Sequence, residues 1–226
     1  MNNSYLVLDI ETIASAKPEV REYIAANIKP PKTMSVAATI EKWHKESKAG
    51  AVDEERAKTS FDGTFGSVVC IGYALNDSGE PRSCHGLDEG ILLCEFNDTL
   101  NALIPPSMFS AYTVVGHSVA NFDLRFLLQR YIVNQVQPHP IINMAAQAKP
   151  WDSSRVYDTM TQFAGIGKTI SLDRLCFALG IPSSKDEMDG SMVGQAVLDG
   201  RLDDVVRYCC KDVAATRAIY QRMTFV

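Results

Sequence analysis

The sequence predicts an α/β protein whose helices pack against a mixed β-sheet. Apolar runs at residues 5–10 and 67–75 are typical of strands buried on both faces. A turn sequence at 76–79 joins the second run to a returning strand near 81–85, which indicates an antiparallel hairpin. Beyond residue 88, short apolar runs alternate with helical patterns. A meander followed by this alternation predicts a mixed sheet covered by helices.

The later elements are expected in a definite order. Asp88 is placed to cap a helix that runs to about residue 104, where Pro105 and Pro106 end it. The apolar positions expected to face the core are Ile91, Leu92, Phe96, Leu100 and Leu103. The remaining expected elements are a strand at 112–115, a helix at about 121–132, a proline-rich loop at 138–150, a strand at 156–157, and helices from 158, at 171–179, 192–198 and 203–223.

Length and composition predict one globular domain spanning residues 1–226. The chain is 46% hydrophobic and carries a net charge of −5, which argues against a protein that coats DNA non-specifically. An acidic balance does not exclude a nuclease, because acidic metal ligands lower the net charge. The six cysteines show no zinc-finger spacing and are interpreted as reduced core thiols. No signal peptide or span of about 20 apolar residues is present, so we expect a cytoplasmic protein without a membrane partner.

A polar segment from 12 to 62 interrupts this pattern. It holds one helix candidate at 35–58, and residues 29–58 contain seven Lys or Arg against five Asp or Glu. We interpret residues 29–60 as a partly basic helical insertion that flanks a cleft, where Lys42, Lys45 and Lys48 would contact a single strand. Trp43 and His44 could stack on bases there. The alternative is a solvated amphipathic helix.

Three acidic motifs are candidates for chemistry. Asp9 and Glu11 lie at the expected end of the first strand, on one face and roughly 7 Å apart. Asp123 lies in the first turn of the helix after the sequence GHSVANF. Tyr208 and Asp212 share a helix face with Val205, Ala215 and Ile219, so Asp212 interrupts an apolar stripe. Each motif has an ordinary alternative: a polar strand end, good helix-start chemistry, or a buried salt bridge.

Together the three motifs resemble the DEDDy 3′–5′ exonucleases of the DnaQ-like, ribonuclease H-like superfamily. Residues 8–12 (LDIET) are similar to the first motif of that superfamily. Further likeness lies in Lys185, Asp189-Gly190-Ser191 and the late Tyr208, Asp212 helix, which resemble the predicted PolB-like exonuclease family. The resemblance implies a ribonuclease H-like mixed sheet of about five strands flanked by α-helices.

The resemblance also implies a site with two Mg²⁺ or Mn²⁺ ions. Asp9, Glu11 and Asp212 would hold the ion that activates water, and Asp9 and Asp123 would hold the second. Tyr208 would orient the attacking water. Carboxylate oxygens are the ligands that these cations prefer, and paired cations suit phosphodiester hydrolysis. The implied substrate contacts come from Ile10, Thr12, His117, Ser118, Asn121 and Phe122. Related sequences often carry Asn where this chain has Ser118, so Asn121 is the substitute amide.

The expected function is release of nucleoside 5′-monophosphates from the 3′ end of single-stranded nucleic acid, with DNA favoured. One alternative is an exoribonuclease that trims RNA ends, and another is a non-catalytic nucleic-acid-binding module. A DNA polymerase or repair complex is the partner expected to act in trans, because the sequence shows no polymerase domain. DNA versus RNA preference, biological pathway, oligomeric state and source stay open.

Overall fold

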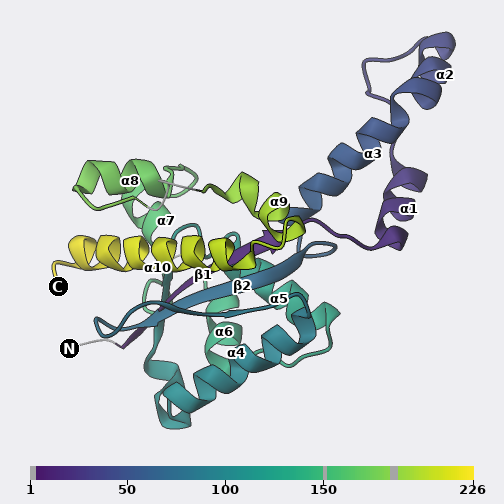
Figure 1. Cartoon of the computed structure of the whole chain (residues 1–226). Helices are drawn as coiled ribbons and strands as arrows, with labels where there is room; N and C mark the ends of the chain where they lie inside the picture. Colours follow the sequence, from purple (N-terminus) through teal and green to yellow (C-terminus); the bar gives the residue numbers. More distant parts are fainter. Residues whose placement is uncertain (1–3, 150–151, 184–187) are drawn as a thin grey trace.

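A computed structural model of the chain describes residues 4–149, 152–183 and 188–226. Its centre is a five-stranded sheet in the order β3-β2-β1-β4-β5 (Figure 1). The strands are β1 (Tyr5–Ile13), β2 (Ser67–Leu75), β3 (Arg82–His85), β4 (Thr113–Gly116) and β5 (Val156–Asp158). β2 and β3 run antiparallel to their neighbours, and β4 and β5 run parallel to β1, so the sheet is mixed as predicted.

The central strand β1 is longer than the sequence predicted. It continues past residue 10 to Ile13 and pairs with β2 along its length, with an irregularity between Glu11 and Thr12. β4 pairs with β1 only from Tyr5 to Val7. The second half of β1 therefore has one edge without a partner strand, and this edge faces the loop that follows β4.

Helices cover both faces of the sheet, as the three-layer arrangement in Figure 1 shows. One face carries α4 (Glu89–Leu103), α5 (Asp123–Val133) and α6 (Pro140–Ala146), which build the main hydrophobic core with Leu6, Leu8 and Ile71. The other carries α7 (Thr159–Ala164), α8 (Leu172–Leu179), α9 (Val193–Leu198) and the long α10 (Leu202–Thr224). Val7, Ala74 and Val115 face α10. Burial on both sides explains the continuous apolar runs of β1 and β2.

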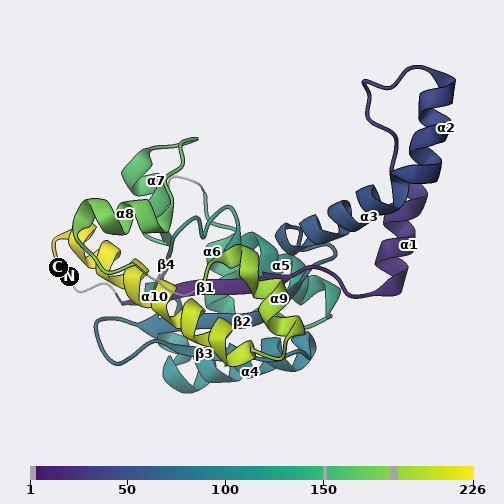
Figure 2. The ribbon, with the colours of Figure 1, turned by 45° about the horizontal axis from the view of Figure 1, so that its top comes forward.

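The polar segment forms an arm that projects from the sheet (Figures 1 and 2). It contains α1 (Pro18–Asn27), α2 (Ala37–Glu46), α3 (Lys48–Ala57) and the 3-10 turn η1 (Lys58–Phe61) at its base. The prediction of a single helix at 35–58 was wrong, because Ser47 separates α2 from α3. The helix α1 was not predicted. The hydrophobic cluster of the arm is small, with Val20, Ile24 and Val52 buried. A short apolar stripe of this kind gives a weak helical signal in sequence.

Other local expectations need correction. The loop predicted at 138–150 contains α6, because Pro140 occupies the first helical turn, a position that proline favours, and His139 caps it. Ile91 and Leu103 of α4 are 57% and 39% exposed, so they lie outside the core. All six cysteines are free, but Cys94 is exposed. Lys185, which the resemblance singled out, lies outside the described residues.

Two more 3-10 turns complete the fold, η2 (Pro106–Ala111) and η3 (Gly190–Met192). As predicted, α4 ends just before the two prolines: its cap residue is Ile104, and Pro105 is already the cap residue at the start of η2. Asp88 caps α4 as predicted, accepting a hydrogen bond from the Ile91 N–H. Among the described residues, no helix is both long and apolar enough to cross a membrane.

Candidate active site

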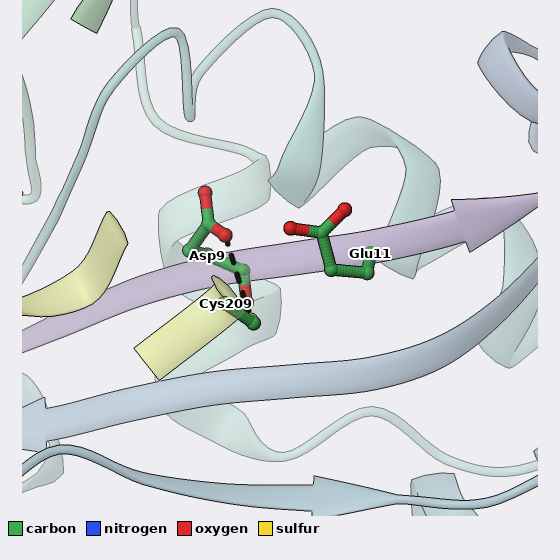
Figure 3. Close-up of side chains that lie close together, drawn as sticks. All are labelled: Asp9, Glu11 and Cys209. Carbon is green, nitrogen blue, oxygen red and sulfur yellow. Dashed lines mark hydrogen bonds between the residues drawn. The ribbon is translucent and has the colours of Figure 1, made fainter. Parts of the chain in front are cut away.

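Asp9 and Glu11 project from the same face of β1, with their carboxylates side by side (Figure 3). A carboxylate oxygen of Asp9, a carboxylate oxygen of Glu11 and the sulfur of Cys209 all lie within 4.8 Å of one another. The two acids lie inside the strand and not at its end, because β1 continues to Ile13. A polar strand end turning into solvent is therefore not the explanation for this motif.

Asp123 begins α5 and is only 3% exposed. Its Oδ1 accepts a hydrogen bond from the Ile10 backbone N–H at 3.0 Å. β4 no longer pairs with β1 at this point, so the N–H of Ile10 is open to the side chain. This bond attaches the second acidic motif directly to the residue between Asp9 and Glu11.

Tyr208 and Asp212 lie one turn apart on α10, so the charge of the Asp212 carboxylate acts on the Tyr208 hydroxyl. Asp212 is buried, as are Val205, Ala215 and Ile219 of the predicted apolar stripe. The helix therefore carries a carboxylate into its buried face. Burial is the largest cause that raises the pKa of Tyr208. The charges of Asp212, Glu11 and Asp9 raise it further, so the hydroxyl stays protonated.

Gly72 permits the close approach of α10 to this part of the sheet. It is the β2 residue directly opposite Asp9. A Cβ at this position would lie 2.7 Å from the Cys209 sulfur and 2.9 Å from a methyl carbon of Val213. The Cys209 thiol in turn donates to the Asp9 carboxylate at 3.5 Å. The role of Gly72 was not predicted from the sequence, because its packing partners are more than 130 residues away in the chain.

The four carboxylates repel one another. Burial, and then the charges of Asp123, Glu11 and Asp212, raise the pKa of Asp9 well above its ordinary value. Burial and Asp212 raise that of Glu11 in the same way. Burial is also the main cause that raises the pKa of Asp123, to about 7, against opposing backbone hydrogen bonds. Asp9, Glu11 and Asp123 therefore share one electrostatic environment with Asp212.

These residues fit divalent cations. No ion pair identified within the described parts of the chain neutralises Asp9, Glu11 or Asp123. Clustered carboxylate oxygens are the ligands that Mg²⁺ and Mn²⁺ prefer. Cys209 is less suited to these hard cations, because its thiol is buried and protonated. Its hydrogen bond with Cys70, together with burial, raises the pKa of Cys209.

Asp158 positions the loop between β4 and α5. Its two carboxylate oxygens accept hydrogen bonds from the N–H groups of Ser118 and Ala120, both at 3.1 Å. Ser118 adopts a left-handed conformation with φ of 64°, which these bonds hold in place. Asp158 also caps α7. The sequence predicted Asp158 at the start of a helix, and Asp158-Thr159 also resembles the DnaQ-like pattern between its second and third motifs, but neither signal predicted the bonds to this loop.

The predicted substrate contacts occupy different settings. Both ring nitrogens of His117 are engaged, Nδ1 with the Thr159 hydroxyl and Nε2 with the Ile170 carbonyl. Burial lowers the pKa of His117, so the ring is neutral. The Thr12 hydroxyl donates to the Ser60 carbonyl at 2.6 Å. Their roles toward substrate, and that of Ser118, stay predictions.

Three more predicted contacts surround the carboxylates. Ile10 is buried and its N–H is taken by Asp123. Asn121 is exposed and does not cap α5, whose cap residue is Phe122. Phe122 is half-buried and packs against Phe126, with 5.6 Å between ring centroids. Asn121 and Phe122 immediately precede Asp123, so both lie at the edge of the acidic cluster.

A mixed five-stranded sheet flanked by helices, with an acidic cluster at its centre, is the α/β fold of ribonuclease H-like exonucleases. The chain belongs to the family described as predicted 3′–5′ exonucleases related to the exonuclease domain of PolB, which matches residues 88–226. This match covers more than half of the chain, including Asp123, Tyr208 and Asp212. Asp9 and Glu11 precede the matched residues, and the fold brings them to the others. No curated protein matches the chain.

Proposed function

We propose that the chain is a metal-dependent exonuclease that hydrolyses the 3′-terminal phosphodiester bond of single-stranded DNA and releases nucleoside 5′-monophosphates. The observation that carries this proposal is the proximity of Asp9, Glu11, Asp123 and Asp212 in one mutually repelling cluster, in which Asp9 is half-buried and the other three are buried. Such a cluster is stabilised when divalent cations bind it. Family membership supplies the reaction class.

Each side chain has a proposed role. Asp9, Glu11 and Asp212 hold one cation, and Asp9 and Asp123 hold the other. Bound Mg²⁺ or Mn²⁺ would lower the pKa of water and neutralise charge on the scissile phosphate. Tyr208 stays protonated at neutral pH, so its hydroxyl orients the attacking water and does not remove its proton.

The test is degradation of single-stranded oligonucleotides of DNA and RNA, compared side by side with Mg²⁺, Mn²⁺ or EDTA. A 5′ label should yield a ladder that shortens from the 3′ end, and the product should co-migrate with nucleoside 5′-monophosphate. EDTA and the Asp123→Asn variant should both abolish the ladder. Faster cleavage of RNA would replace the DNA assignment. A lack of cleavage under every metal condition would reject the enzymatic function.

A further inference from the structure

Phe61 is an exposed aromatic residue at the base of the arm. It ends η1, and 76% of it is accessible to solvent. Its ring lies 6.4 Å from that of Phe122, centroid to centroid, with a tilt of 54° between the planes. Phe122 in turn packs on Phe126 of α5. The Phe61 ring is therefore exposed to solvent and lies against the Phe122 ring, which is itself packed on α5.

Both rings lie beside the acidic cluster. The carbonyl of Ser60, the neighbour of Phe61, accepts the hydroxyl of Thr12, which follows Glu11 in β1. Phe122 immediately precedes Asp123, whose carboxylate is bound to Ile10. The hydrogen bond beside Phe61 and the one beside Phe122 therefore hold both residues close to the acidic cluster.

The part of the arm that lies next to the acidic cluster is η1, and not α2. In both views α2 lies at the far end of the arm, away from the sheet (Figures 1 and 2). Lys42 and Lys45 pair with Glu46 and Glu41 on the same helix. Lys42 and Lys45 therefore do not flank the acidic cluster as expected, whereas contact of these lysines and of Lys48 with a nucleic-acid strand stays a prediction. Trp43 is buried, so it offers no stacking surface.

We propose that Phe61 is a substrate-positioning residue whose ring, supported by Phe122, stacks on an unpaired base near the 3′ end of the nucleic acid. The inference rests on the proposed function, to which it adds a source of strand selectivity. An exposed aromatic ring stacks on any base whose face is free, whereas a base inside a duplex is covered by its neighbours. The arm thus contributes to substrate binding with one aromatic side chain.

The test combines three variants with two substrates. Phe61→Ala removes the ring, Phe61→Trp keeps an aromatic face, and Phe177→Ala removes a ring that is 89% exposed on α8. The substrates are single-stranded DNA with normal 3′-terminal nucleotides and the same strand with abasic ones. Phe61→Ala should raise KM for the normal strand roughly 5- to 100-fold with kcat nearly unchanged, because stacking is made equally before and during the reaction.

On the abasic strand, Phe61→Ala and the unmodified protein should have the same KM, since no base is left to stack. Phe61→Trp should restore the KM for the normal strand, and Phe177→Ala should leave it unchanged. An unchanged KM in Phe61→Ala, or an equal rise on both strands, would overturn the proposal. The second result would assign Phe61 to the support of the arm.

A binding measurement separates this proposal from the proposed function. The fluorescent base 2-aminopurine at the 3′ end is quenched when it stacks, and the titration is done in EDTA so that hydrolysis plays no part. Quenching by the unmodified protein and Phe61→Trp, with loss in Phe61→Ala, supports the platform even if no cleavage is found. Equal quenching by the unmodified protein and Phe61→Ala, or no quenching by either, would reject it.

Discussion

The N–H of Ile10 donates to Asp123 Oδ1 at 3.0 Å, joining two acidic motifs that are 113 residues apart. The carboxylate that we propose as a cation ligand thus also satisfies a buried backbone group of β1. These two tasks depend on different properties of the side chain. An oxygen acceptor is enough for the hydrogen bond, whereas a cation needs the negative charge.

Substitutions of Asp123 separate the two tasks. Asp123→Asn keeps an oxygen acceptor for Ile10, so the free energy of unfolding should be unchanged or higher in EDTA. Asp123→Ala leaves the buried N–H unpaired and should lose about 1–3 kcal/mol. Both should lower nuclease activity more than roughly 100-fold, because a cation ligand is lost. Equal unfolding free energies in urea would show that the hydrogen bond contributes nothing to stability.

The stability of the metal-free protein should fall as pH rises. Folding raises the pKa of Asp123 from 3.8 to about 7, so the folded state keeps a proton that the unfolded chain has released. The carboxyls of Asp9 and Glu11 shift in the same direction. The melting temperature in EDTA should therefore be several degrees lower at pH 8 than at pH 5.

Two controls test the source of this pH dependence. Mg²⁺ or Mn²⁺ at pH 8 should restore the melting temperature, and Asp123→Asn should reduce its fall between the two pH values. An Asp123→Asn variant with the same pH dependence as the unmodified protein would exclude this carboxyl as a contributor.

Gly72→Ala should displace α10 and thereby disturb the acidic cluster. Its Cβ would meet Cys209 and Val213 at distances that force α10 away from the sheet. We expect a loss of about 1–3 kcal/mol in unfolding free energy. Weaker Mn²⁺ binding in calorimetry should follow, because Asp212 moves with the helix. Gly50→Ala on α3 is the matched control: its Cβ meets no atom within 4 Å, and stability should rise slightly.

Tyr208→Phe tests the water-orienting hydroxyl. The ring and its packing remain, so the melting temperature should change little. We expect kcat to fall roughly 10- to 1,000-fold with a small change in KM, because the contacts that bind substrate remain. Asp212→Asn should be more damaging, since it removes a cation ligand. Turnover near that of the unmodified protein in Tyr208→Phe would mean that another group positions the water.

A buried ion pair should support the base of the arm. Two nitrogens of Arg130 bind the two oxygens of Glu89, and a third reaches the carbonyl of Gly63 at 3.1 Å. Both side chains are almost fully buried. Arg130→Met should therefore cost about 3–5 kcal/mol, because Glu89 would be left as an unpaired buried charge.

The control for this prediction is Lys45→Met, which breaks an exposed pair with Glu41. Its cost should stay below about 1 kcal/mol. Chemical unfolding followed by circular dichroism measures both variants. Similar losses in the two proteins would show that the buried pair contributes no more than a surface pair.

The fold class and the order of the acidic motifs were available from the sequence because they depend on local patterns. Continuous apolar runs predicted β1 and β2, and the turn between residues 75 and 82 predicted the hairpin. The spacing of Tyr208 and Asp212 along an apolar stripe predicted a carboxylate on the buried face of a helix. Each inference needed only a few neighbouring residues.

Only the tertiary structure decided how distant segments meet. In the arm, α1 and α3 pack against each other through Val20, Ile24 and Val52, with Phe65 beside them, and no local pattern specifies that cluster. Position 72 needs glycine because the Cys209 sulfur and a Val213 methyl group, both far away in the chain, occupy the space next to a Cβ. The bond between Ile10 and Asp123 likewise exists because β4 stops pairing beside it. Such contacts are set by packing in three dimensions, which residue order alone does not contain.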